Sequence, residues 1–360
     1  MVKKQILFFG PLPQPITGQS IAFQNVCEHL LGDNLLINTT YFGKNKLLNS
    51  LYSMFMTIYY FLFKSIGTVY FTASRSRLGF IKDFFLIFIA HFNSVRVITH
   101  IHGADFDHFL ATLGIMKNFV LRAFSKIDTC IVLLDEMKSS FERFPGMRIE
   151  IVFNCYGKEF ERSNVGLKED LTVLYLSNIM MSKGILDFMA SAKEVMSRFS
   201  HVKYIIAGSF VSDEIYTRDE IEWIFNRELH AIQELFGKDR FQFIGSVCGQ
   251  EKVEVFQKSS IFVLPSYYKS EAFPISFLEA MRTGNAIVTT EHNYLPRIIN
   301  GNNGIVVPVK SVDQLVNAQE ELILNPSKLQ SIQHYNINFA KRNYNSEAFI
   351  TKIEHILEGL

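Results

Sequence analysis

The sequence predicts an α/β protein with two doubly wound domains facing each other across a cleft, and two observations carry this prediction. Short runs of β-branched, aliphatic and aromatic residues, typical of buried parallel strands, alternate with longer segments of helical periodicity. The alternation stops at a polar stretch, Gly157–Asp170, and then restarts. Two successive runs of strand and helix therefore imply two layered domains joined by a linker.

The first domain is expected at residues 1–160. An apolar strand at 4–9 leads into a turn rich in glycine and proline, and then into a helix with apolar residues every three or four positions. Further strands are predicted at 68–72, 96–101, 129–134 and 150–153. A helix at 346–360 is expected to pack back on this domain.

The second domain is expected at residues 171–345. Its first strand is followed by a helix that starts near Ile185 and has apolar residues at i, i+3 and i+4. Its strands are predicted at 172–176, 204–207, 242–244, 261–264 and 286–290.

Composition favours a folded protein in a reducing compartment. Of the 360 residues, 48% are hydrophobic and 20% are charged, as in globular proteins. The scattered cysteines form no C-x-x-C pair and are expected to be buried, inert thiols: Cys27, Cys130, Cys155 and Cys248. Residues 1–126 hold 12 basic and 5 acidic side chains, which favours an anionic partner such as a membrane surface or a lipid pyrophosphate. No nucleic-acid motif accompanies them, so no nucleic-acid partner is expected.

The segment Leu47–Phe63 has no charged residue and is flanked by Lys46 and Lys64. It is shorter than the about 20 residues of a membrane span, and polar residues interrupt it. Its apolar residues fall on one helical stripe: Leu48, Leu51, Phe55, Ile58, Tyr59 and Leu62. We expect an amphipathic helix that packs on the sheet and partly meets a bilayer; the alternatives are an internal core helix and a true span.

The strand at 261–264 precedes a short helix with sharp boundaries. Pro274 suits the first helical position, and Gly284 suits the residue just past the end. The free N–H groups of the first turn, around Phe273 to Ser276, are expected to face the carboxyl end of the sheet. Helix dipole and unpaired donors make such a place an anion site that favours phosphate.

Two glutamates bracket this anion site. Glu271 lies just before the helix, and Glu279 lies about two turns into it. A carboxylate accepts two hydrogen bonds at once, which suits a vicinal diol. A ligand with a diphosphate between two diol-bearing rings, such as a nucleotide sugar, would use all three features. The alternative is that both glutamates are solvated surface acids.

The segment Glu271–Gly284, with Glu-x7-Glu followed by Ala-Met and glycine, resembles the retaining glycosyltransferases of the GT-B fold, carbohydrate-active family four. The resemblance covers essentially the whole chain and implies two Rossmann-like domains, retention of anomeric configuration, and neither a metal nor another cofactor. It implies that Glu271 binds hydroxyls of the donor sugar and Glu279 those of the ribose. It also places the diphosphate at the backbone amides of Phe273, Ile275 and Ser276.

Other segments match the same family. Gly18 resembles its N-terminal glycine loop, and His102, at a strand end before Gly103, resembles its sugar-contacting histidine. Gly208 and Val247 match the loops that line the nucleotide base. The resemblance therefore makes these residues part of the donor site, with His102 among the catalytic ones alongside Lys183 and Glu271.

One departure concerns the cations at the diphosphate. Many relatives have an arginine and a lysine in this loop, whereas here Asn178 replaces the arginine and Lys183 remains. Asparagine donates a hydrogen bond but supplies no charge. Stabilisation of the leaving group is therefore expected to depend on Lys183 and on helix N-termini.

The acceptor side is less clearly marked. Asp105 and Asp107 form a D-x-D tripeptide that binds metal in the other glycosyltransferase fold, but no metal is expected here. By resemblance to relatives acting on cell-envelope glycans, Arg75, Arg77 and Lys82 are candidate acceptor contacts, and Asp105 is a candidate neighbour of the acceptor pocket.

These patterns predict a transferase that moves a sugar from a nucleotide diphosphate, most simply a UDP-sugar, to a lipid-linked oligosaccharide. The expected setting is synthesis of a bacterial capsule, lipopolysaccharide O-antigen or exopolysaccharide. The protein would be cytoplasmic and peripherally bound to the inner face of the cytoplasmic membrane. The alternatives are a nucleotide-sugar epimerase and a non-catalytic partner of another transferase that binds nucleotide or membrane.

Overall fold

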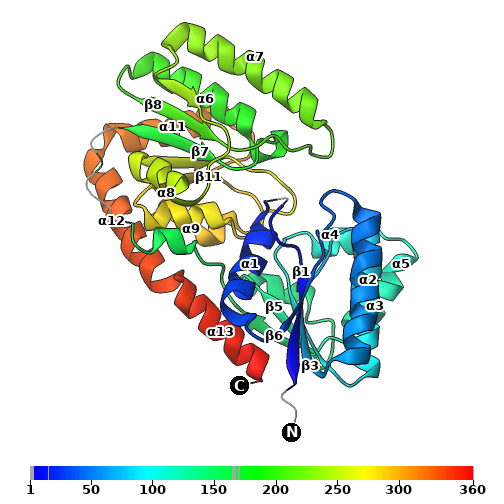
Figure 1. Ribbon diagram of the computed structural model, residues 1–360. Helices are drawn as coiled ribbons and strands as arrows, with labels where there is room; N and C mark the ends of the chain where they lie inside the picture. Colours follow the sequence, from blue (N-terminus) through cyan, green and yellow to red (C-terminus); the bar gives the residue numbers. More distant parts are fainter. Residues whose placement is uncertain (1–3, 15, 164–167, 169–170, 360) are drawn as a thin grey trace. The chain divides into compact units, whose positions relative to one another are not determined.

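The computed structural model describes residues 4–14, 16–163, 168 and 171–359. The chain divides into two compact units (Figure 1). Unit 1 comprises Met1–Cys155 and Glu347–Leu360, and unit 2 comprises Tyr156–Ser346. Part of the predicted linker, 164–167 and 169–170, lies outside the described residues.

Each unit contains a six-stranded parallel sheet with helices, so the predicted α/β class is confirmed. In unit 1 the strand order is β2-β1-β3-β4-β5-β6. The strands are β1 (Gln5–Gly10), β2 (Leu35–Asn38), β3 (Ile66–Thr72), β4 (Arg96–His100), β5 (Thr129–Val132) and β6 (Arg148–Ile151). The strand β2, at one edge of the sheet, was not among the predicted strands.

The helices of unit 1 are α1 (Gly18–Leu30), α2 (Lys46–Phe63), α3 (Arg77–Phe92), α4 (Phe106–Ala111), α5 (Met116–Phe124) and α13 (Ser346–Glu358), with a 3-10 turn at Asp135–Ser140. The helices α1 and α13 lie on one face of the sheet, whereas α2, α3 and α5 lie on the other (Figure 1). Phe8 and Tyr70 of the sheet share one apolar core with Phe23 of α1 and Phe349 of α13. The last helix is therefore an integral layer of unit 1.

The helix α2 has two distinct faces, as an amphipathic helix does, and it buries the polar one. The expected apolar stripe is exposed, with Phe55 at 67% and Leu62 at 70%, while Asn49, Ser53 and Thr57 are buried. The alternative of an internal core helix is therefore wrong. Among the described residues, no helix combines the length and the hydropathy that crossing a membrane requires.

Unit 2 has the strand order β12-β11-β10-β7-β8-β9. The strands are β7 (Thr172–Leu176), β8 (Lys203–Ala207), β9 (Phe241–Phe243), β10 (Ile261–Leu264), β11 (Ala286–Thr290) and β12 (Gly304–Val307). The helices are α6 (Ile185–Arg198), α7 (Arg218–Phe236), α8 (Gly249–Lys258), α9 (Ile275–Arg282), α10 (Leu295–Ile298), α11 (Val312–Leu324) and α12 (Pro326–Asn343), with 3-10 turns at Lys158–Phe160 and Met181–Lys183. The edge strand β12 was not predicted.

The order of the strands in unit 2 reverses between β7 and β10. From β7 the chain proceeds outward through β8 and β9, and from β10 it proceeds the other way through β11 and β12. The loops after β7 and β10 therefore leave the carboxyl edge of the sheet at the point where the strand order reverses, which is where α/β sheets generally bind ligands.

Two details correct the sequence analysis. The helix α9 begins at Ile275, so Pro274 is its N-cap rather than its first helical residue. Cys27, Cys130 and Cys155 are buried as expected, but Cys248 is exposed, so the expectation of a buried thiol is wrong there.

A buried asparagine on α12 holds two loops of unit 2 together. The Asn336 side-chain amide donates to the carbonyl oxygens of Asn285 at 2.7 Å and Asn303 at 3.0 Å, ahead of β11 and β12. Asn336 is fully buried. Its loss leaves two carbonyl oxygens without this donor in a place that water does not reach.

We therefore expect Asn336→Ala to lower the free energy of unfolding of unit 2 by about 2–3 kcal/mol, and its melting temperature by roughly 5–10 °C. Scanning calorimetry of the full chain measures the shift. Asn338→Ala on the same helix is the matched control, because Asn338 is exposed and its amide donates only to the carbonyl oxygen of His334 among the described residues. Equal shifts in the two variants would contradict the role of Asn336.

Candidate functional site

The loop after β7 carries Lys183, and the loop after β10 carries Glu271; the structure brings these two predicted residues into contact. The Lys183 Nζ lies 2.5 Å from the Glu271 Oε2, and the Ser266 hydroxyl donates to the same oxygen at 3.0 Å. The Lys183 ammonium also lies 5.0 Å from the ring centroid of Tyr268. Both partners are largely shielded from water, with side-chain exposures of 13% and 9%. The cation and the carboxylate therefore neutralise each other.

Gly184 allows this contact to form. It has a φ of 73°, and a Cβ atom built on it would lie 2.1 Å from the carbonyl oxygen of Pro265. Only glycine accepts this left-handed conformation and this approach without strain. The amide of Tyr267 donates to the carbonyl oxygen of Ser182 at 2.8 Å, which joins the two loops again. Glycine therefore fixes Lys183 at the edge of the sheet.

The second predicted glutamate is also paired with a lysine, which sequence reasoning missed. Glu279 is 2% exposed, and its Oε1 accepts from the Lys252 Nζ of α8 at 2.5 Å. Within the described residues its Oε2 has no hydrogen-bond partner. Burial raises the pKa of the Glu279 carboxyl, and the Lys252 ammonium opposes that rise. One oxygen of this buried carboxylate is thus left without a hydrogen-bond donor among the described residues.

The first turn of α9 lies between Glu271 and Glu279 along the chain. Pro274 precedes the helix in an extended conformation, and no side chain of the described residues caps the first-turn N–H groups. Ile275 and Ser276, both predicted to meet a diphosphate, begin the helix, and Phe273 packs against Tyr344 at a centroid distance of 5.6 Å. The uncapped turn therefore has the properties of an anion site.

The loops after β8 and β9 border the same edge of the sheet. The amide of Gly208 donates to the carbonyl oxygen of Gly245 at 2.8 Å, two residues before Val247. A Cβ atom on Gly208 would lie 1.9 Å from the carbonyl oxygen of Ser177, so a larger residue would push the loops apart. Asn178 is half-buried, and its carbonyl oxygen accepts from the Tyr175 hydroxyl at 3.3 Å. These predicted base and phosphate contacts all belong to neighbouring loops.

In unit 1, His102 is the predicted residue with the most unusual environment. Its ring lies 4.0 Å from that of His100 between centroids. Both ring nitrogens are buried, and neither has a hydrogen-bond partner within the described residues. Burial lowers the pKa of His102 to about 3, and the charge of Arg75 adds to the shift. His102 is therefore neutral at pH 7, with one donor and one acceptor unused.

A cavity of about 500 Å³ in unit 1 contains two of the predicted acceptor residues. Arg75 and Lys82 line it, together with Lys44 and Lys46, which sequence reasoning had not assigned to the acceptor. Thr72, at the end of β3, also lines the cavity; its hydroxyl is buried and has no hydrogen-bond partner among the described residues. Cations together with a free hydroxyl donor suit an anionic ligand.

Other predicted acceptor residues lie outside the lining of this cavity. Arg77 is exposed and donates to the carbonyl oxygen of Thr112 at 2.8 Å. Asp105 pairs with Arg75 at 2.8 Å, whereas Asp107 pairs with Arg143 at 2.5 Å. The two carboxylates of the D-x-D tripeptide therefore belong to different ion pairs. Gly18 begins α1, and a Cβ atom there would meet no described atom within 4 Å.

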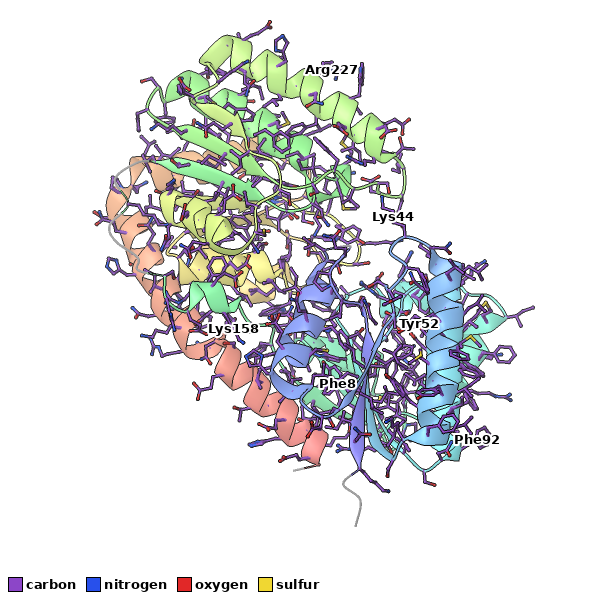
Figure 2. All side chains as sticks on the ribbon, in the orientation of Figure 1. Phe8, Lys44, Tyr52, Phe92, Lys158 and Arg227 are labelled. Carbon is purple, nitrogen blue, oxygen red and sulfur yellow. The ribbon has the colours of Figure 1, made fainter. Side chains whose placement is uncertain are left out.

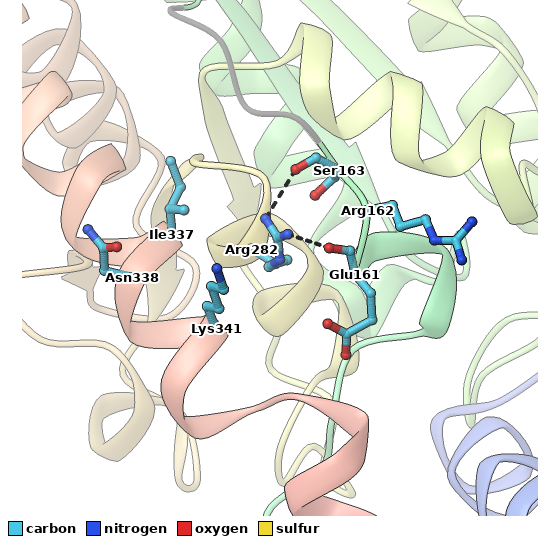
Figure 3. A pocket seen from close by; sticks show the side chains of 7 residues that line it. All are labelled: Glu161, Arg162, Ser163, Arg282, Ile337, Asn338 and Lys341. Carbon is cyan, nitrogen blue, oxygen red and sulfur yellow. Dashed lines mark hydrogen bonds between the residues drawn. The ribbon is translucent and has the colours of Figure 1, made fainter.

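Another pocket, in unit 2, lies around the end of α9 that is remote from the first turn (Figure 3). The Arg282 guanidinium donates to the carbonyl oxygens of Glu161 at 2.7 Å and Ser163 at 3.4 Å. These contacts attach the segment that enters unit 2 to α9, which indicates a structural role.

The chain matches the protein family described as Glycosyl transferases group 1 over residues 157–339. One relative is the N,N'-diacetylbacillosaminyl-diphospho-undecaprenol alpha-1,3-N-acetylgalactosaminyltransferase of Campylobacter jejuni, 26% identical over 202 residues, which are 55% of this chain and 48% of that protein. Another is the D-rhamnosyltransferase WbpZ of Pseudomonas aeruginosa, 37% identical over 83 residues, 22% of each chain. The matches thus span about half the length of these relatives, or less.

Solved structures resemble the chain over nearly its whole length. The structure of Anabaena Alr3699/HepE in complex with UDP has a TM-score of 0.75 at 14% identity and covers 99% of this chain and 100% of that one. Sucrose-phosphate synthase from Thermosynechococcus elongatus has a TM-score of 0.73 at 14% identity and covers 99% of both chains. At this identity the likeness shows the fold, and the predicted GT-B architecture is confirmed. The family match covers half of the chain, with Lys183, Glu271 and Glu279 inside it, and the protein belongs to the family Glycosyl transferases group 1.

Proposed function

We propose that this protein transfers a sugar from a nucleotide diphosphate sugar to a lipid-linked glycan, with retention of anomeric configuration and without a metal. The observation that carries the proposal is the pair of buried Lys–Glu contacts, Lys183–Glu271 and Lys252–Glu279, on the two sides of the uncapped turn of α9. One carboxylate serves each diol-bearing ring, and the turn between them serves the diphosphate.

Donor binding then exchanges partners at Lys183. The Glu271 carboxylate accepts hydrogen bonds from hydroxyl groups of the sugar, and the Lys183 ammonium turns to the diphosphate. Lys183 and Glu271 are 88 residues apart in sequence. Because both groups already face one another with little water between them, the exchange moves charge over a short distance. As the glycosidic bond breaks, negative charge grows on the diphosphate, and Lys183 with the α9 amides stabilises it.

The position of Asn178 leaves this arrangement with few positive charges. An arginine in that loop would supply a second cation to the leaving group, whereas asparagine supplies only a hydrogen bond. Lys183 is accordingly the side-chain cation assigned here to the diphosphate. His102, neutral at pH 7, contributes a hydrogen bond to the donor sugar rather than a charge.

For the donor, UDP-sugars are the first choice because several structures of the same fold hold UDP, including Anabaena Alr3699/HepE. For the acceptor, the Campylobacter jejuni relative is named for a diphospho-undecaprenol substrate. In the cavity of unit 1, Lys44 and Lys46 are the cations proposed to meet such a diphosphate, whereas Arg75 and Lys82 are paired with Asp105 and Asp83. The proposed setting is bacterial surface-polysaccharide synthesis at the inner face of the cytoplasmic membrane, with relatives that include the Staphylococcus aureus capsular transferase CapM.

Removal of the cation at the leaving group tests the proposed chemistry. We expect Lys183→Ala to lower kcat by about 10²–10³-fold, because the developing charge loses a contact of about 3–4 kcal/mol. Release of nucleotide from the donor measures turnover. Lys193→Ala, at an exposed position of α6, is the control and should leave turnover unchanged. Near-normal turnover in Lys183→Ala, with an unchanged melting temperature, would refute the assignment.

Removal of Lys252 tests whether its ammonium keeps the Glu279 carboxyl ionised. Burial already raises the pKa of this carboxyl above its ordinary 4.5, so without the ammonium the pKa rises further. The folded state then binds more protons than the unfolded state, and stability falls as pH rises above about 4.5. In Lys252→Met we expect a steeper fall in unfolding free energy with rising pH, and a raised KM for the donor. Lys252→Arg should restore both; parallel pH profiles for Lys252→Met and wild type would contradict the pairing.

Donor screening without metal tests the substrate class. We expect a UDP-sugar at about 100 times its Kd, in buffer with EDTA, to raise the melting temperature of unit 2 by roughly 5–10 °C. Turnover with a lipid-linked acceptor should persist in EDTA. A melting-temperature shift with GDP-sugars alone would show that the donor carries GDP rather than UDP. Loss of turnover in EDTA would overturn metal independence. Binding of the donor without transfer to any acceptor would favour a non-catalytic partner.

A further inference from the structure

The helix α2 is oriented opposite to an ordinary surface helix. Its buried side carries Asn49, Ser53 and Thr57. The Ser53 and Thr57 hydroxyls each donate to the carbonyl oxygen four residues earlier at 2.7 Å. The Asn49 side chain bonds the backbone of Phe42 and Gly43 in the preceding turn. The polar groups are thus satisfied within α2 and the turn before it, which lets small polar residues face the protein.

The outward side of α2 is apolar along its whole length. Eight large apolar residues are exposed there: Leu47, Leu48, Leu51, Phe55, Ile58, Tyr59, Leu62 and Phe63. A water-facing helix places such residues inward, because their burial removes apolar surface from water. Contiguous apolar patches on this scale mark sites of contact with a protein or a membrane.

The apolar surface continues onto the neighbouring helices. On α3, Phe84 and Phe88 lie 4.3 Å apart between centroids, Phe92 follows at 6.2 Å, and Phe119 of α5 lies 6.3 Å from Phe84. Phe92 is 80% exposed. The three helices lie on the same side of the unit 1 sheet (Figure 1), and Tyr52 and Phe92 are labelled on that side in Figure 2. We call the exposed apolar residues of α2, α3 and α5 the apolar face.

The charges of these helices indicate whether the apolar face binds a second copy of the chain or a lipid bilayer. All three helices are fully described, and their one acidic residue, Asp83, is buried beside Lys82. The exposed charged residues on these helices, or within two residues of their ends, are basic: Lys44, Lys46, Lys64, Arg77, Lys117, Arg122 and Lys126. A second copy docked face to face would bring like charges together, whereas an anionic bilayer offers both a hydrocarbon interior and negative head groups.

We propose that the apolar face docks unit 1 on an anionic lipid bilayer, with α2 lying in the plane of the interface. Phe55, Leu62 and Phe92 enter the acyl region, and the lysines at both ends of α2 meet lipid phosphates. The docking does not depend on the identity of the donor, because the residues that perform it are separate from Lys183, Glu271 and Glu279.

The docked orientation also has a consequence that rests on the proposed function. Lys46, Asn49 and Ser50, in the first turn of α2, line the cavity of unit 1. With α2 in the interface, the mouth of that cavity lies at the level of the head groups. A lipid diphosphate can then enter it while its hydrocarbon chain stays in the bilayer.

Vesicle co-sedimentation of the full chain tests the docking. Wild type should bind vesicles of phosphatidylcholine with phosphatidylglycerol more tightly than pure phosphatidylcholine, and less tightly at high salt. Leu51→Ser with Phe55→Ser should lower the partition coefficient by at least about tenfold. The matched control is Trp223→Ser with Leu235→Ser on α7 in unit 2, because these residues are exposed to a similar degree, 64% and 61%.

A tryptophan placed on α2 reports whether this helix enters the bilayer. In Trp223→Phe with Phe55→Trp, the chain's one tryptophan lies on α2, and anionic vesicles should shift its emission to the blue. Absence of vesicle binding by wild type, or undiminished binding by Leu51→Ser with Phe55→Ser, overturns the docking. A wild-type dimer in solution that the same double substitution dissociates overturns it in favour of a second copy. The vesicle and fluorescence assays contain neither a sugar donor nor a glycan, so their result does not depend on whether the protein has transferase activity.

Discussion

Unit 2 of this protein depends on one constraint: a carboxylate that is taken out of water needs a cation. Glu271 and Glu279 are both buried, and each is within 2.5 Å of a lysine ammonium from a different loop or helix. An isolated charge there would cost several kcal/mol, so the pairs fix where the loop after β7 and the helix α8 can lie. Gly184 has a left-handed conformation and packs on Pro265, and this backbone geometry directs the Lys183 side chain toward Glu271. Charge balance therefore fixes the arrangement of the proposed donor site.

This balance also explains what the sequence could and could not predict. Glu271, Glu279 and the turn of α9 are adjacent in sequence, so their spacing with Pro274 and Gly284 was enough to place them. Lys183 was found from its loop motif, but its contact with Glu271 spans 88 residues, and no local pattern encodes it. Lys252 was missed because nothing in the start of α8 distinguishes it from other exposed-looking lysines. The two missed strands, β2 and β12, lie at sheet edges and have four residues each, but so short an edge strand is not always missed, since β6 and β9 were predicted.

The helix α2 shows a different limit of sequence reasoning. Periodicity identified the stripe from Leu48 to Leu62, and that stripe does exist as one side of the helix. Periodicity does not say whether the apolar side faces the protein or its surroundings, since a helix reads the same in both orientations. The orientation is set by Ser53 and Thr57, whose hydroxyls bond back to their own helix and so let a polar side approach α3 closely. Small back-bonded residues opposite large apolar ones are the signal that would have indicated the reversal.

The two units differ in the state of particular lysines, although unit 1 also contains the ion pairs Arg75–Asp105 and Lys82–Asp83. In unit 2, Lys183 is paired with Glu271, so the proposed donor must replace this carboxylate at Lys183 and offer hydroxyl groups to it in return. A simple phosphate cannot do both, and this favours nucleotide sugars over free phosphate. In unit 1, the exposed Lys44 and Lys46 form no ion pair within the described residues, so their field extends into solvent and attracts any anionic surface. Under the proposed function, selectivity therefore comes from the paired Lys183, and long-range attraction comes from the unpaired Lys44 and Lys46.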